Sequence, residues 1–162
     1  MKGVQALKLI KSILFYGLQF TWGLPQNLAG AIMYLLQRKN GKTERFHYGI
    51  VTYIDKKNFG GVSLGVFTFV CAGRSEEWMH DTCIHEYGHT FQSLLLGPLY
   101  FIVVGIPSFV WCNLPVFAKQ HKADPGHYYK LYCESWANSW GSYFAKDTFL
   151  EEKYFKGKQN KA

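Results

Sequence analysis

The stretch His85-Glu86-Tyr87-Gly88-His89 decides how the centre of this chain folds and what it can bind. On a helix, residues i and i+4 lie on one face, so both imidazoles can reach a single metal ion. Neutral imidazole is a good ligand for Zn²⁺, and Glu86 is placed to act as general base on a metal-bound water without being a ligand itself. The pattern therefore predicts a helix with a zinc site, with His85 and His89 as ligands and Glu86 as the catalytic group.

A catalytic zinc site usually has three protein ligands and one water, so a third ligand is expected elsewhere in the chain. Glu134 is the favoured candidate. If its surroundings are helical, Glu134 and Asn138 share a face, and Asn138 can orient a ligand imidazole. Asp124, in the turn-like run Ala123-Asp-Pro-Gly126, is a rival third ligand. Further possible ligands, each more typical of a surface or capping position, are His47, His80, His121 and His127.

A hydrolytic site also needs a hydrogen-bond donor that faces the substrate oxygen in the transition state. Four side chains near Glu134 in the sequence can donate in this way, and the sequence does not choose among them: His127, Tyr128, Tyr129 and Tyr132. A strand expected at 62–70 is a candidate edge that binds an extended peptide through backbone hydrogen bonds.

The two runs His85-Glu86-Tyr87-Gly88-His89 and Glu134-Ser-Trp-Ala-Asn138 together resemble the motifs of the gluzincin branch of zincin metallopeptidases. The second run is similar to the form found in membrane-embedded gluzincins, the prenyl-protein endopeptidase and heat-shock membrane protease group. The resemblance covers these motifs and the hydrophobic stretch between them. It implies a small zincin-like fold, a Zn²⁺ cofactor and a peptide or protein substrate. By residue, it implies His85, His89 and Glu134 as ligands and Glu86 as base. Asn138 stands where the family more often has aspartate.

Other classes fit the sequence less well. Gln92 and Leu95 stand where the metzincin pattern needs Gly and His, which excludes that branch. Site-2 intramembrane proteases pair H-E-x-G-H with a downstream aspartate, a part that Asp124 would take. They carry the motif inside a transmembrane helix, whereas the lead-in from Arg74 to Asp81 is polar here. Two hypotheses outside the hydrolases are a non-catalytic metal-binding membrane protein and a basic lipid-binding module in which the motif is incidental.

Composition and charge indicate the class of partner. The chain has 162 residues, enough for a single domain over 1–162, and its 48% hydrophobic and 18% aromatic content argues against disorder. The formal net charge is +7, mostly from lysine, and arginine occurs only three times. Because the sequence has no nucleic-acid-binding motif, a membrane surface is favoured over nucleic acid as the partner of this basic chain. The four cysteines form no C-x-x-C pair and are expected to be free, buried thiols in a reducing compartment.

Two hydrophobic blocks, 1–37 and 94–112, are the candidate membrane-associated segments. The first is expected to form two helices broken near Gly23-Leu24-Pro25. The second contains no charged residue, but Gly97-Pro98 and Gly105-Ile106-Pro107 interrupt it. Two short segments that dip into the membrane and return are therefore expected rather than one span, with a buried hairpin as the alternative. In that topology the lysine-rich segments, and with them the active site, lie on the cytoplasmic side.

The remaining segments predict a small α+β domain. The alternation over 46–54 and 62–70, around a turn at 55–61, predicts a β-hairpin or a small antiparallel sheet. A polar turn is expected at 38–45 and a polar connection at 115–125. Ser75 is expected to cap the helix that carries the histidines, with Glu76 and Glu77 in its first turn. The last helix, which carries Glu134, is expected over 126–145.

Overall fold

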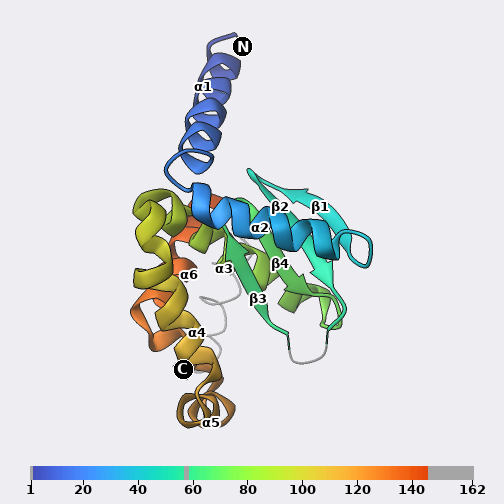
Figure 1. Cartoon of the computed structure of the whole chain (residues 1–162), viewed down its shortest axis with the longest axis vertical. Helices are drawn as coiled ribbons and strands as arrows, with labels where there is room; N and C mark the ends of the chain where they lie inside the picture. The colour runs from blue at the N-terminus through green and yellow to red at the C-terminus, as the bar shows by residue number, and fades with distance from the viewer. Residues whose placement is uncertain (1, 57–58, 146–162) are drawn as a thin grey trace, which may run out of the picture.

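The computed structural model describes residues 2–56 and 59–145, which form a small α+β domain (Figure 1). Within them, six α-helices surround a four-stranded mixed sheet. The α+β class is therefore confirmed. All four cysteines are free, as predicted, but Cys112 is exposed rather than buried.

The N-terminal block forms two helices, as predicted. Helix α1 (Lys2–Gln19) extends away from the body, and α2 (Leu24–Gln37) runs across one face of the sheet (Figure 1). The break falls at Gly23, and Pro25 lies in the first turn of α2, where a missing backbone N–H costs no helical hydrogen bond. Only the last turns of α1 are buried, through Phe15 and Gln19.

The sheet consists of two hairpins side by side, so the expectation of two long antiparallel strands is wrong. Strands β1 (Lys42–Phe46), β2 (Gly49–Ile54), β3 (Gly61–Leu64) and β4 (Phe67–Cys71) have the order β1-β2-β4-β3. The central pair, β2 and β4, is parallel, and the two outer pairs are antiparallel.

Two tight turns explain the difference. His47 has φ 50° and Gly65 has φ 68°, so each predicted strand is cut by a turn that alternating hydrophobicity does not reveal. At Gly65 a Cβ would overlap the Asn27 side chain of α2, so only glycine fits there. As a result β4 is central and fully buried, and β3 forms one edge of the sheet, with β1 at the other. The predicted polar turn at 38–45 contains most of β1 instead.

Helix α3 (Glu76–Leu96) begins as predicted: the Ser75 hydroxyl accepts the Trp78 backbone N–H at 3.3 Å, and two glutamates lie in the first turn. It packs most extensively against α6 (Tyr132–Ala145). The two backbones approach very closely, because a Cβ on Gly88 would overlap the Ala137 carbonyl and one on Gly141 would overlap that of Ile84. This tight crossing brings the motif of α3 against the acidic first turn of α6.

The second hydrophobic block turns sharply at Gly97, which has φ 52°. A 3-10 turn (Gly97–Leu99), a π-helical turn (Phe101–Gly105) and α4 (Ile106–Asn113) follow, so the predicted interruption at Gly97-Pro98 is confirmed. No single helix in the described ranges is long and apolar enough to cross a membrane. By length and composition alone, the stretch from Glu76 to Asn113 qualifies as a pair of helices bent by 119°.

Two expectations for the C-terminal part are wrong. Residues expected to form a polar connection instead form α5 (Pro115–Ala123), which starts on a proline at a position where proline favours a helix. The last helix starts at Tyr132 rather than Gly126, because Leu131 is extended and ends a 3-10 segment at Pro125–Lys130.

Candidate metal centre

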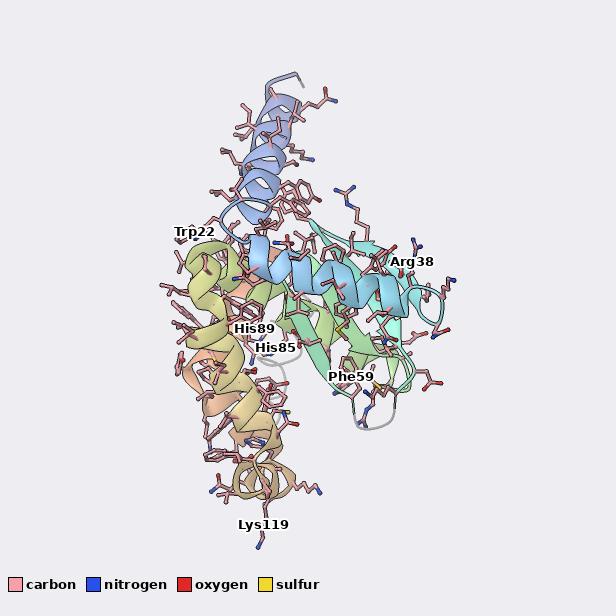
Figure 2. All side chains as sticks on the ribbon, in the orientation of Figure 1. Trp22, Arg38, Phe59, His85, His89 and Lys119 are labelled. Carbon is pink, nitrogen blue, oxygen red and sulfur yellow. The ribbon has the colours of Figure 1, made fainter. Side chains whose placement is uncertain are left out.

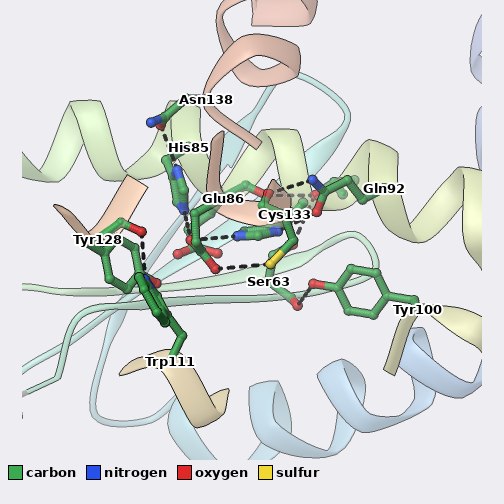
Figure 3. A network of polar contacts seen from close by, with 12 residues as sticks. Ser63, His85, Glu86, Gln92, Tyr100, Trp111, Tyr128, Cys133 and Asn138 are labelled. Carbon is green, nitrogen blue, oxygen red and sulfur yellow. Dashed lines mark hydrogen bonds and ion pairs between the residues drawn. The ribbon is translucent and has the colours of Figure 1, made fainter. Parts of the chain in front are cut away.

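The crossing of α3 and α6 brings His85, His89 and Glu134 together. Figure 2 places both histidines near the middle of the molecule, and Figure 3 shows His85 beside Glu86 and Asn138. One ligand atom from each lies within 4.8 Å of the others. The Nε2 atoms of His85 and His89 are 3.0 Å and 3.5 Å from the same Glu134 oxygen, Oε2. All three residues are buried, and Glu134 has no exposed surface. The group can therefore hold a metal ion with two nitrogen ligands and one oxygen ligand.

Hydrogen bonds behind the imidazoles set their tautomers. The Nδ1 atom of His85 is 2.8 Å from Oδ1 of Asn138, and Nδ1 of His89 is 2.7 Å from Oε1 of Gln92. An amide oxygen only accepts hydrogen bonds, so each Nδ1 carries the proton. With an ion bound, both Nε2 atoms are unprotonated and direct their lone pairs at it. Without an ion, a proton on Nε2 is donated to the Glu134 carboxylate instead. Asn138 thus lies where the sequence predicts, one helical turn after Glu134.

Gln92 is the residue that sequence reasoning missed. It has no exposed surface, and its Nε2 donates to the Cys133 carbonyl at 2.8 Å. That bond fixes which end of the amide faces His89, and it ties α3 to the residue before Glu134. The available signal was its position three residues after His89, on the same face of a helix. In the sequence, Gln92 otherwise stands out only as a mismatch to the metzincin pattern.

The buried carboxylate of Glu134 is ionised. Burial alone raises the pKa of this carboxyl, but its contacts with His85 and His89 outweigh burial and hold the pKa well below its ordinary value. Both ion pairs found for Glu134 in the described part of the chain involve these two imidazoles. A buried carboxylate is costly unless a positive charge offsets it. A divalent cation on the three ligand atoms supplies that charge.

The surroundings of Glu86 shift its pKa upwards, in the opposite direction to that of Glu134. Burial raises the pKa of its carboxyl, His85 opposes that shift and the nearby Glu134 adds to it, so that the pKa is about 7. The first residue of β3, Gly61, lies against this carboxylate, because a Cβ there would overlap Oε1 of Glu86. A carboxyl that titrates near neutral pH is suited to accept a proton and release it again. Its position between α3 and β3 leaves it beside the ligands rather than among them.

Two of the four predicted donors lie at the site. The rings of Tyr128 and Tyr129 are centred 6.5 Å and 5.5 Å from the His85 ring. Burial raises the pKa of Tyr128, so its hydroxyl keeps its proton and remains a donor. The Tyr132 hydroxyl bonds the Val103 carbonyl instead, and His127 stacks on Trp111 with ring centroids 5.1 Å apart.

The other candidate ligands lie apart from the three-residue group. Asp124 is exposed, and its carboxylate accepts from the Gly126 backbone N–H at 3.0 Å and pairs with Lys130 at 3.2 Å. The ring of His121 packs on Trp111. The other two imidazoles contact aromatic rings at the sheet: His47 stacks on Tyr87, and His80 lies edge-on to Phe46.

No model of a known protein family, no curated protein and no solved structure matches this chain significantly. The geometry of these residues is therefore the basis on which a function can be inferred.

Proposed function

We propose that this protein is a zinc-dependent metallopeptidase of the gluzincin type. The observation that carries the proposal is the convergence of the two imidazole Nε2 atoms and the Glu134 carboxylate, with Glu86 beside them. A set of two histidines and one glutamate is a usual protein ligand set of catalytic zinc, whose fourth position takes water or substrate. Bound there, Zn²⁺ would lower the pKa of that water and polarise a carbonyl.

The residues of the chain account for the proton transfers. Glu86, whose pKa is about 7, takes a proton from the attacking water and delivers it to the leaving amine. Burial of Glu86 keeps its carboxylate from being stabilised by bulk water, which makes it a stronger base. One of the two tyrosines whose rings lie near His85, Tyr128 or Tyr129, would bond the oxygen that becomes negative in the transition state.

Strand β3 supports a peptide as the substrate. The Gly60 carbonyl accepts the Cys71 N–H at 3.0 Å, and bonded residues alternate along an antiparallel ladder. Gly61 and Ser63 therefore direct their backbone N–H and C=O groups to the outer edge of the sheet. The Tyr100 hydroxyl reaches that edge and donates to the Ser63 carbonyl at 3.2 Å. An extended peptide paired at this edge would pass beside Glu86.

Geometry favours this proposal over the site-2 protease hypothesis. In that hypothesis Asp124 is the third ligand, but Asp124 is exposed and paired with Lys130. Glu134 is fully buried, and one of its oxygens lies within 3.5 Å of both imidazoles.

The test is the substitution Glu86→Gln, which removes the base but no ligand. Wild type and variant are each loaded with one equivalent of zinc and incubated with a random peptide library, and cleavage is followed by mass spectrometry. We expect wild type to cleave and Glu86→Gln to keep its zinc and lose at least a hundredfold in rate. Glu76→Gln, an exposed change in the first turn of the same helix, is the matched control.

Equal cleavage by Glu86→Gln would contradict the mechanism. Zinc binding by wild type without cleavage of any library peptide would favour the non-catalytic metal-binding protein instead.

A further inference from the structure

Helix α2 has its polar side inside and its apolar side outside. Its buried residues are Gln26, Asn27 and Gly30. In water, a surface helix normally buries its apolar stripe. Here Met33 and Tyr34 pack partly against the core, but five large apolar side chains are each at least half exposed: Leu24, Leu28, Ile32, Leu35 and Leu36.

Specific bonds hold the polar side of α2 inside. Asn27 donates to the carbonyls of Gln19 and Gly23 at 2.7 Å and 2.8 Å, and its Oδ1 accepts the Val66 backbone N–H at 2.9 Å. Gln26 donates to the Gly97 carbonyl. Turning the helix over would break these bonds and would also require space beside Gly30, which lies directly against strand β4. The outward direction of the leucines is therefore fixed by the fold.

Two neighbouring segments have the same outward apolar character. In α1 the buried side, at Phe15 and Gln19, lies on the same side of the helix as Lys8, while the opposite side carries Leu9, Ile10, Ile13 and Leu14, all exposed. The segment from Leu95 to Val116 also exposes large apolar side chains: Leu95, Leu99, Ile102, Ile106, Phe109, Val110, Leu114 and Val116. In the described residues between Gln37 and Leu94, by contrast, no large hydrophobic side chain is exposed.

We propose that the outward face of α1 and α2, continued by the segment from Leu95 to Val116, docks on a lipid bilayer that carries anionic headgroups. Small or polar residues inside and apolar residues outside are the arrangement of helices that face lipid. Because α2 has only 14 residues and no described helix is a span by itself, the helices lie in the interface plane.

Positive charge at the borders of this face determines the kind of lipid. Lys8 and Lys11 lie on the polar side of α1, and Arg38 and Lys39 follow α2 directly. Figure 2 places Arg38 at one end of α2 and Trp22, which is half exposed, at the other. Tryptophan is enriched at the level of lipid headgroups, and basic residues near a bilayer are attracted to anionic lipids. A symmetric contact with a second copy would instead bring these like charges together.

The experiment is flotation of the full chain after cell-free synthesis with vesicles. One set of vesicles consists of phosphatidylcholine alone. The other also contains about 30% phosphatidylglycerol, which imitates a strongly anionic leaflet. We expect the wild type to float with the mixed vesicles. Leu28→Glu/Leu35→Glu is expected to reduce the floating fraction at least tenfold, since it puts charge on the docking face. Lys8→Gln/Lys11→Gln is expected to lower the affinity for mixed vesicles about fivefold per lysine and to leave the affinity for neutral vesicles unchanged.

Ser139→Glu, an exposed change on α6, controls for added negative charge. All variants replace exposed residues, and circular dichroism checks that they fold. Three results would overturn the proposal: a wild type that does not float, equal loss in Ser139→Glu, or a soluble dimer that Leu28→Glu/Leu35→Glu converts into a monomer. The last result would mean that a second copy covers the face.

Discussion

The molecule contains two groups of buried polar side chains that differ in their chemistry. One consists of His85, His89 and Glu134, between α3 and α6. The other consists of Gln19, Gln26 and Asn27, where α1 and α2 meet the rest of the domain. Members of both groups are buried, and both groups hold helices together.

The difference lies in the balance of donors and acceptors. In the second group, each amide donates to a backbone carbonyl, as Gln19 does to Thr90 at 3.1 Å, and the group's one acceptor without a partner, Gln26 Oε1, is uncharged. In the first group, three acceptor atoms converge and one carries a negative charge. Burial of polar groups alone therefore does not indicate a binding site. Convergence of several buried acceptors on a charged carboxylate does, because a cation or protons must offset that charge.

The largest expected effect is that of metal removal. If the first group holds a divalent ion, a chelator lowers the free energy of unfolding of the wild type by about 4 kcal/mol when free metal had been a thousandfold above Kd. Urea unfolding with and without chelator measures this. Glu134→Gln should be insensitive to the chelator, while Asn27→Ala should stay sensitive. Identical curves for the wild type in the two conditions would mean that the group is not a metal site.

The second prediction concerns the pH dependence of the metal-free protein. The folded-state pKa of Glu86, about 7, lies above its ordinary value of 4.5. Its contribution to stability is therefore fully present below pH 4.5 and is lost as the pH rises to 7. Glu86→Gln removes this loss, so at pH 8 the metal-free variant should be more stable than the metal-free wild type by up to about 3 kcal/mol. If the difference in free energy of unfolding between the metal-free variant and the metal-free wild type is the same at pH 4.5 and pH 8, this account is contradicted.

A third prediction tests the second group. Asn27→Ala leaves the Val66 N–H without its buried acceptor and removes the donor to two carbonyls. We expect a loss of about 2 to 3 kcal/mol in urea unfolding, with zinc affinity unchanged. Asn40→Ala, at an exposed position, is the matched control and should change stability little. A lower zinc affinity in Asn27→Ala would show that the two groups are coupled.

The smallest expected effect is the loss of zinc affinity when a hydrogen bond to a ligand imidazole is removed. Gln92→Leu keeps the volume but removes the acceptor for His89 and the donor to the Cys133 carbonyl. Zinc affinity, measured by competition with a chelating dye, should fall about 10- to 100-fold. Gln92→Glu restores the acceptor and should recover part of the loss. Equal affinities in wild type and both variants would assign Gln92 a purely structural part.

The sequence predicted the local features of the site because the spacing of the residues determines them. Two histidines at i and i+4 lie on one face of any helix, and Glu134 and Asn138 do so by the same rule. Gln92 was missed because its partner, the Cys133 carbonyl, is a backbone group 41 residues away. The short sequence separation of Gln92 from His89 was the only local sign.

The sheet was predicted less well than the site. Its parallel pairing of β2 with β4 depends on contacts between two hairpins, which alternation within one strand does not specify. The turns at His47 and Gly65 preserve the hydrophobic alternation on either side, so alternation alone predicts an unbroken strand at each place. The glycines that shape the site, Gly61 and Gly88, allow close approach to groups far along the chain, and that requirement appears only in three dimensions.

The most direct test of the metal centre is the zinc content of purified wild type, Glu134→Gln and Asp124→Asn. The two substitutions neutralise the two rival carboxylates in the same way. The structure predicts about one zinc per chain in wild type and in Asp124→Asn, and almost none in Glu134→Gln. A wild type without zinc, or zinc that is kept in Glu134→Gln and lost in Asp124→Asn, would contradict the centre built from His85, His89 and Glu134.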